Sequence, residues 1–277
     1  SKLQDPEHTS LLVRCLKSEH APALREELSK SAAKLIDAAF SPQASANSAE
    51  EAFQMQYSGI LITKTLLNFY PDWLSQNKDV LTKLHALWNS PDRQERLKNE
   101  ASLSLRHSRE TTYLIRCLLH YLRLNHHDTT LFLDLLSAIT TPYCNGMVEL
   151  VEFYHKYVPD NYSIQQKRVL LDAVLADFTP EVSSTGAGAS AGAATVGQRA
   201  PSGFSFAHKQ QILKSFVIRV FEVAVEKNQQ LLSEELIGLF LNNFFTLERD
   251  SGGLRHQLAY ELLSILGLIL KNAPNEL

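Results

Sequence analysis

The tripeptide His126-His127-Asp128 is the strongest candidate for catalytic chemistry in this sequence. It lies between two leucine-rich stretches, in "HYLRLNHHDTTLFLDLL" at 120–136. Neutral imidazoles and a carboxylate together suit a divalent metal ion that activates water for hydrolysis. A helical metal-dependent phosphohydrolase of the HD type would need a His, a His-Asp pair and a second Asp, in that order. The sequence offers such a set: His85 or His107, then His127 and Asp128, then Asp172.

The same tripeptide also fits the joint of a helical hairpin. Histidines are compatible with the negative end of a helix dipole, and Asp128 is a good N-cap for the following "TTLFLDLL". The chain has 10 histidines, so a His, His-Asp, Asp order is easily assembled by chance. The pattern therefore favours the hairpin, and we expect no metal and no cofactor.

Other nucleophiles are no better supported. Cys15 and Cys117 lie on apolar faces of predicted helices, and Cys144 lies in a predicted loop with no base fixed beside it. No G-x-S-x-G motif occurs, and an all-helical chain lacks the strand that this motif requires. The sequence therefore predicts a protein that is not an enzyme.

One basic feature is a candidate for binding a partner protein. Arg109, Arg116 and Arg123 are spaced seven residues apart, so they lie nearly in line along one helix. Such a stripe suits an acidic partner segment or a phosphate backbone, although the solvated face of an amphipathic helix has the same appearance. Both interpretations remain open from the sequence.

Composition narrows the class of partner. The 277 residues carry a net charge of −3, which gives no general electrostatic footprint for nucleic acid or for an anionic membrane. The longest apolar runs, such as "LLSILGLIL" at 262–270, are too short to span a bilayer. Three widely spaced cysteines fit a reducing compartment. The chain begins without methionine, so we expect a piece of a longer polypeptide.

Helical spacing and helix-capping residues recur along the whole chain. Asp5-Pro6, Ser90-Pro91 and the capping box Ser163–Gln166 mark helix starts, and the apolar positions between such starts recur every three or four residues. No convincing strand alternation is found. The fold is predicted to be all-α, with about twelve helices. They cover 6–19, 22–39, 53–69, 72–88, 91–99, 106–124, 128–140, 145–157, 163–177, 207–227, 233–247 and 251–271.

These helices predict a solenoid of paired antiparallel helices, in which each pair buries its apolar face on the neighbouring pairs. Residues 1–182 and 206–277 are expected to form one continuous solenoid. The segment between them, 183–205, is rich in Gly, Ala and Ser, and we predict a disordered insertion there. The last helix, 251–271, is too apolar to face water, so we expect a further neighbour to pack on it.

Three stretches, in this order, resemble a region of the TRRAP family, which comprises very large transcription-associated pseudokinase scaffolds. They are "YPDWLSQNKDVLTKLHALWNS" (70–90), "SRETTYLIRCLLHYLRLNHHDTTLFLDLL" (108–136) and "VELVEFYHKYVPDNYSIQQKRVLL" (148–171). The resemblance covers about a hundred residues in the middle of the chain and includes no catalytic motif. The insertion at 183–205 is a departure that looks particular to this sequence.

The resemblance implies HEAT-type repeats in a nuclear scaffold of a histone acetyltransferase complex. It implies as partners the other repeats of the same long chain, coactivator-complex subunits and transcriptional activators, with no membrane and no direct nucleic-acid contact. A scaffold segment is therefore the main hypothesis. A free-standing HEAT-like adaptor and the HD-type phosphohydrolase are the alternatives.

Overall fold

The computed structural model describes residues 22–40, 48–93, 105–139, 145–176, 206–244 and 258–272. All regular secondary structure in these ranges is helical, and none of it is strand. The prediction of an all-α fold is therefore confirmed. The helices divide into two compact units, one made of Ser1–Phe132 with Thr141–Leu150 and the other of Leu133–Thr140 with Val151–Leu277. No helix in the described ranges is long and apolar enough to cross a membrane.

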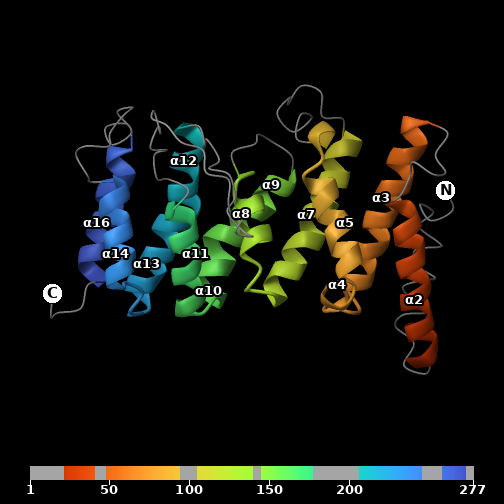
Figure 1. Cartoon of the computed structure of the whole chain (residues 1–277), viewed down its shortest axis with the longest axis horizontal. Helices are drawn as coiled ribbons and strands as arrows, with labels where there is room; N and C mark the ends of the chain where they lie inside the picture. The colour runs from red at the N-terminus through yellow and green to blue at the C-terminus, as the bar shows by residue number, and fades with distance from the viewer. Residues whose placement is uncertain are drawn as a thin grey trace, which may run out of the picture. The chain divides into compact units, whose positions relative to one another are not determined.

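The first unit is built from helices in two layers. Its elements are α2 (Pro22–Ala39), α3 (Ala49–Leu67), α4 (Trp73–Gln76), α5 (Lys78–Trp88), α7 (Leu105–Leu124) and the starts of α8 (Thr129–Leu136) and α9 (Asn145–Glu152). Helix α2 packs on α3, and α7 packs on both α3 and α5. Figure 1 shows α2 and α3 side by side.

Long-range contacts give the direction of the helices in one layer. The Trp73 indole N–H donates to the Ser29 hydroxyl at 2.7 Å, and Lys83 forms an ion pair with Asp37. The residue numbers rise together on both sides, so α2 runs in the same direction as α4 and α5.

The helices of the second layer in this unit also run in one direction. Arg106 forms an ion pair with Glu50 at 2.6 Å, and the Cys117 thiol lies 3.9 Å from the Ile60 carbonyl. Helices α3 and α7 therefore also run in the same direction. Alternate helices stack in parallel while consecutive helices reverse, which is the arrangement predicted for a solenoid of paired antiparallel helices.

The segment predicted as one helix over 72–88 is two helices. Asn77 interrupts it with φ −116° and ψ 65°, and its side-chain amide donates to the Trp73 carbonyl at 2.8 Å. An asparagine side chain that bonds the local backbone competes with the helical hydrogen bond at that position. The break lets Trp73 and Leu74 turn into the core, where they are 2% and 1% exposed.

A buried ion pair ties the segment that follows α5 to α7. Arg93 and Glu110 are 3% and 1% exposed, and the guanidinium donates both to Glu110 Oε2 at 2.6 Å and to Oε1. Arg93 also donates to the Thr111 hydroxyl at 3.2 Å and to the Leu87 carbonyl at 2.8 Å. These additional bonds satisfy the guanidinium in a site from which water is excluded.

Breaking this pair should cost far more than breaking a partly exposed one. Glu110→Ala leaves a buried, uncompensated guanidinium, so we expect the free energy of unfolding to fall by about 3 kcal/mol in urea denaturation. Glu149→Ala removes the partner of Arg116, whose side chain is 44% exposed, and should cost less than about 1 kcal/mol. Equal losses for the two variants would contradict this account.

The second unit repeats the two-layer plan. After the end of α9, its first layer holds a π-helical turn (Phe153–Tyr157) with α10 (Val158–Asn161), then α12 (Phe206–Ile212), a second π-helical turn (Leu213–Val217) and α13 (Ile218–Glu226), and then α16 (Ala259–Asn272). Its second layer holds α11 (Ile164–Ala176) and α14 (Glu234–Phe244), which pack on each other.

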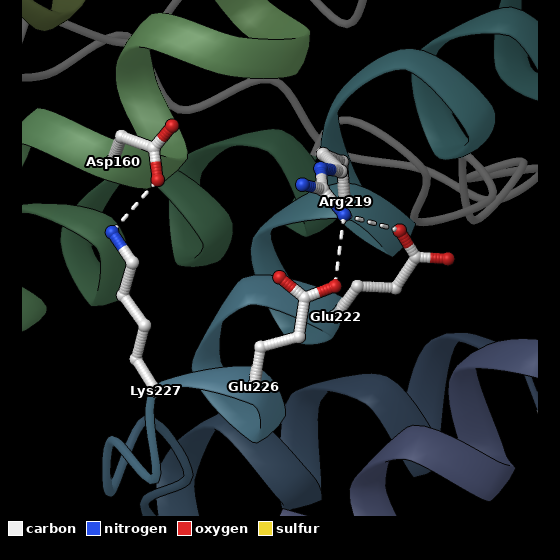
Figure 2. Close-up of polar contacts among 5 residues, drawn as sticks. All are labelled: Asp160, Arg219, Glu222, Glu226 and Lys227. Carbon is white, nitrogen blue, oxygen red and sulfur yellow. Dashed lines mark hydrogen bonds and ion pairs between the residues drawn. The ribbon is translucent and has the colours of Figure 1, made fainter.

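Helices of the first layer run in the same direction. The rings of Tyr154 and Phe216 meet edge to face with centroids 6.1 Å apart, and Lys227 bonds Asp160 at 2.7 Å at the far ends of the same helices (Figure 2). The hydrogen bond from Lys227 holds the pKa of the Asp160 carboxyl below its ordinary value. Figure 2 also shows Arg219 of α13 held between Glu222 and Glu226 of the same helix.

The helices predicted over 145–157 and 207–227 are present, and each contains a π-helical turn. In the first, the Val158 N–H donates to the Phe153 carbonyl five residues back, immediately before Pro159, which has no N–H to donate. In the second, the Ile218 N–H donates to the Leu213 carbonyl. The two turns lie against each other.

The turn between α13 and α14 is held from both sides. The Asn272 side chain at the end of α16 donates to the Gln229 carbonyl at 2.7 Å and accepts from the Leu231 and Leu232 amides at 3.2 and 3.4 Å. From α11, Arg168 donates to the carbonyls of the same turn, and the buried Lys167 ammonium donates to Gln229 Oε1 at 3.0 Å. Side chains of two neighbouring helices thus fix one turn.

Removing Asn272 should loosen this turn. Asn272→Ala leaves the Leu231 and Leu232 amides and the Gln229 carbonyl without this partner, at a cost of about 2 kcal/mol in stability. Hydrogen exchange should show faster exchange at the Leu231 and Leu232 amides. Lys271→Ala, at the exposed neighbouring position, should change neither quantity. Unchanged exchange in Asn272→Ala would show that the turn does not depend on this side chain.

Several predicted features lie outside the described residues. They are the helix over 6–19, most of the helix over 91–99, Cys15, Cys144 and the segment 183–205. The domain boundaries at 182 and 206 therefore stay predictions. The capping box is confirmed, because the Ser163 amide donates to Gln166 Oε1 at 2.9 Å and the Gln166 amide donates to the Ser163 hydroxyl at 3.3 Å.

Candidate functional site

The His126-His127-Asp128 segment forms the joint between α7 and α8. Asp128 Oδ1 accepts a hydrogen bond from the Leu131 amide at 3.1 Å, so the prediction that Asp128 caps the following helix is confirmed. His126 Nε2 lies 2.9 Å from the Arg123 carbonyl, and His127 is exposed. Asn125 fixes the joint by donating to the Ser75 hydroxyl at 2.8 Å and to the Tyr121 carbonyl at 2.9 Å.

The remaining candidates for metal ligands are His85, His107 and Asp172. His85 Nε2 lies 3.0 Å from the Asn89 side-chain amide, and the His107 ring packs on Phe53 with centroids 4.7 Å apart. Asp172 belongs to the second unit. Among the described residues, no group of three or more His, Cys, Asp or Glu side chains could hold a metal ion.

Cys117 is a core residue within the first unit. Its side chain is 0% exposed, and burial raises the pKa of its thiol to about 12. A thiol with such a pKa is almost entirely protonated at neutral pH, and the thiolate is the reactive form. The environment of Cys117 is thus that of a structural residue.

The three candidate arginines have different surroundings. Arg109 is exposed, and Arg116 bonds Glu149 through its Nε and Nη2 atoms at 2.6 and 2.5 Å. Arg123 is half-buried in the last turn of α7. Their role in binding a partner stays a prediction, and Arg109 lines a groove.

This groove lies between the parallel helices α3 and α7 and has a volume of about 520 Å³. One side is formed by three residues of α3 and the other by the first turns of α7. The lining residues are Gln54, Tyr57, Leu61, Leu105, Arg106 and Arg109. The Leu105 side chain is 67% exposed and lies beside the two arginines of this lining.

Aromatic rings and cations alternate beside the groove. Tyr57 stacks on Tyr113 with centroids 6.1 Å apart, and Phe53 stacks on Tyr57 at 6.3 Å. Arg106 lies over the Phe53 ring at 4.9 Å, and Lys64 lies over the Tyr113 ring at 4.4 Å. Such cation–π contacts order the long cationic side chains on the surface.

The Tyr57 hydroxyl is a neutral group at the edge of this surface. Burial raises its pKa, and the neighbouring Tyr113 raises it further, while Arg109 acts in the opposite direction. The phenol therefore stays protonated at neutral pH and is able to donate a hydrogen bond to an acceptor in the groove. The surface combines a hydroxyl donor, two guanidinium groups and apolar side chains.

A family model described as the Tra1 HEAT repeat ring region matches residues 1–277, the full length of the sequence. The chain belongs to this family. The resemblance to TRRAP proteins and the HEAT-type fold predicted from the sequence are thereby confirmed.

Similar proteins carry names that refer to transcription. The chain is 28% identical over 175 residues to the Transformation/transcription domain-associated protein of Homo sapiens, and 26% identical over 175 residues to that of Danio rerio; each match covers 61% of this chain and 4% of the relative. It is 26% identical over 109 residues to the Probable transcription-associated protein 1 of Dictyostelium discoideum, covering 39% and 2%. The chain thus spans a small part of these relatives. No solved structure matches it.

The arginine spacing indicates Arg109, but it does not indicate that a groove lies beside this residue. Gln54, Tyr57 and Leu61 recur at steps of three and four on α3, which is a signal of one shared helix face. That signal does not reveal which helix lies beside the face. The groove exists because α7, more than forty residues further along the chain, runs parallel to α3.

Substitution of Asp128 tests directly whether this residue is a helix cap or a metal ligand. Asp128→Ala removes the bond to the Leu131 amide and should lower the free energy of unfolding by about 1 kcal/mol. Asp128→Asn keeps a capping oxygen and should remain close to the parent chain. Metal content measured by plasma mass spectrometry should not change in either variant. Loss of a stoichiometric metal in both variants would overturn the cap interpretation.

Proposed function

We propose that this chain is a non-enzymatic scaffold segment of a large transcription-associated protein, giving structural span and protein-binding surface within a histone acetyltransferase complex. Membership of the HEAT repeat ring family carries the proposal, together with the small share of each relative that the chain covers. The names of the relatives refer to transcription and support a nuclear location.

The mechanism of such a segment is geometric. Helices of one layer stack in the same direction, and turns are bonded to the helices of neighbouring pairs, so each pair fixes the position of the next. The buried Arg93–Glu110 pair and the Asn272 contacts lock these positions. No bond of a substrate is made or broken in this function, and partner proteins are bound on helix faces.

The outer face of α16 supports a place within a longer solenoid. Leu262, Ile265 and Ile269 of this helix are buried, whereas Tyr260, Leu263 and Leu270 are 77%, 65% and 70% exposed. The exposed residues are spaced at three and seven, so they share one side of the helix. We infer that a following helix of the same long polypeptide covers this stripe. The other expected partners are coactivator-complex subunits and transcriptional activators.

The size of the native polypeptide tests this proposal. An antibody raised against the chain, used on a denaturing gel of an extract from its source, should stain one very large band. A band at the mass of 277 residues would contradict the scaffold and favour a free-standing HEAT-like adaptor instead. Competition with the purified chain is the control for specific staining.

A further inference from the structure

We propose that the two π-helical turns of the second unit are a coupled pair, in which the first turn (Phe153–Tyr157) imposes the second (Leu213–Val217) and so sets the position of α12 against α16. Every other helical element that the structure describes is α-helical. π-Helical residues make up less than about 1% of residues in soluble proteins, so two such turns in contact indicate a common cause. This coupling does not depend on the scaffold role proposed above.

The first turn has a cause in its own sequence. Pro159 is buried two residues beyond the turn and has no N–H to donate. In a continuous α-helix its ring would press on the carbonyl of His155, four residues back. The Val158 N–H instead donates to the Phe153 carbonyl, five residues back, which widens the helix just before the proline. A wider turn at this point avoids the crowding.

The second turn has no such local cause. Residues 206–226 include neither proline nor glycine, and their apolar spacing is that of an uninterrupted α-helix. The Phe216 ring of this turn meets the Tyr154 ring of the first edge to face, and both side chains are 0% exposed. In a close-packed core, a wide turn does not fit against a narrow one without leaving a gap or an overlap. Packing on the first turn is therefore the cause of the second.

Helix α16 also contacts the second turn, but only through side-chain ends. Lys214 pairs with Glu261 at 3.2 Å, and Gln210 of α12 donates to the same carboxylate oxygen at 2.9 Å. The Lys214 side chain is 50% exposed, so this long cation does not fix the backbone of the turn as a buried ring does. Glu261 is 2% exposed, and its Oε2 has no hydrogen-bond partner among the described residues. This buried carboxylate therefore depends on where α12 places Gln210.

The state of the second turn decides that position. A π-helical turn holds more residues than the α-helical turn that it replaces, so narrowing it moves one flank by one residue, about 1.5 Å along the axis and about 100° around it. Helix α13 is fixed at its far end by the Lys227–Asp160 bond and along its length by packing on α16. The flank that moves is therefore α12, and Gln210 leaves Glu261. A change in the first turn is thereby passed to α16.

Nuclear magnetic resonance tests the coupling directly. The variant combines deletion of Lys156, whose side chain is 69% exposed, with Pro159→Ala, so that the first turn becomes α-helical. In the parent chain the Ile218 amide donates to the Leu213 carbonyl. We expect it to donate to the Lys214 carbonyl in the variant, as it would in an α-helix. Scalar couplings across hydrogen bonds in the isotope-labelled chain identify the acceptor.

Two matched substitutions are the controls. Lys156→Ala removes the same side chain without changing the number of residues, so both turns should keep the hydrogen bonds of the parent. Lys214→Ala removes the ion pair between the second turn and α16. The Ile218 amide should still donate to the Leu213 carbonyl in that variant, because the first turn is unchanged.

Stability supplies a second measurement. Deleting Lys214 in addition narrows the second turn by the loss of a residue, so α12 keeps its position and two α-helical turns pack together. We expect the urea midpoint of the chain to fall in the first variant and to rise again with this second deletion. If the first variant does not fold, recovery of folding by the second deletion gives the same answer.

Three results would overturn the inference. They are an Ile218 amide that still donates to the Leu213 carbonyl when the first turn is α-helical, a change of acceptor in Lys214→Ala alone, and a second deletion that lowers the urea midpoint further or fails to restore folding. None of these results bears on the size of the native polypeptide, which tests the scaffold separately.

Discussion

A helix pair with apolar surface on two sides is stable only when other pairs cover both of those sides, and this constraint applies to the helices that the structure describes. In each unit, alternate helices meet it by stacking in the same direction, as Glu50–Arg106 and Ile60–Cys117 show for α3 and α7. The same constraint explains the exposed stripe on α16, where Tyr260, Leu263 and Leu270 lie uncovered.

Polar groups set the positions that apolar packing alone would leave variable. Apolar side chains tolerate sliding, whereas a buried guanidinium or amide is satisfied in one arrangement only. Arg93 meets Glu110, Thr111 and the Leu87 carbonyl in the first unit. Lys167 and Asn272 meet one turn from two sides in the second. A segment that serves as a spacer needs such fixed positions, because errors in each pair would accumulate along a solenoid.

The sequence predicted well what depends on local spacing and failed where distant segments meet. The bounds of α2 and the Asp128 cap were readable, because apolar periodicity and capping residues act within a few positions. The break at Asn77 and the π-helical turn at Leu213–Val217 were not predicted, because each looks like continuous helix in apolar spacing. The groove was missed except for Arg109, because the parallel placement of α3 and α7 is a tertiary property.

The central claim is that these pairs continue into a longer stack, and the side of α16 that bears Leu263 is where it is tested most directly. A photo-crosslinking amino acid at position 263, introduced into the native polypeptide, should couple to a helix of the same chain beyond residue 277. Mass spectrometry of the digested product identifies the linked residues. Crosslinks within such a helix are the result that the account predicts. Reaction with solvent alone, as expected for a side chain that stays exposed, would contradict it.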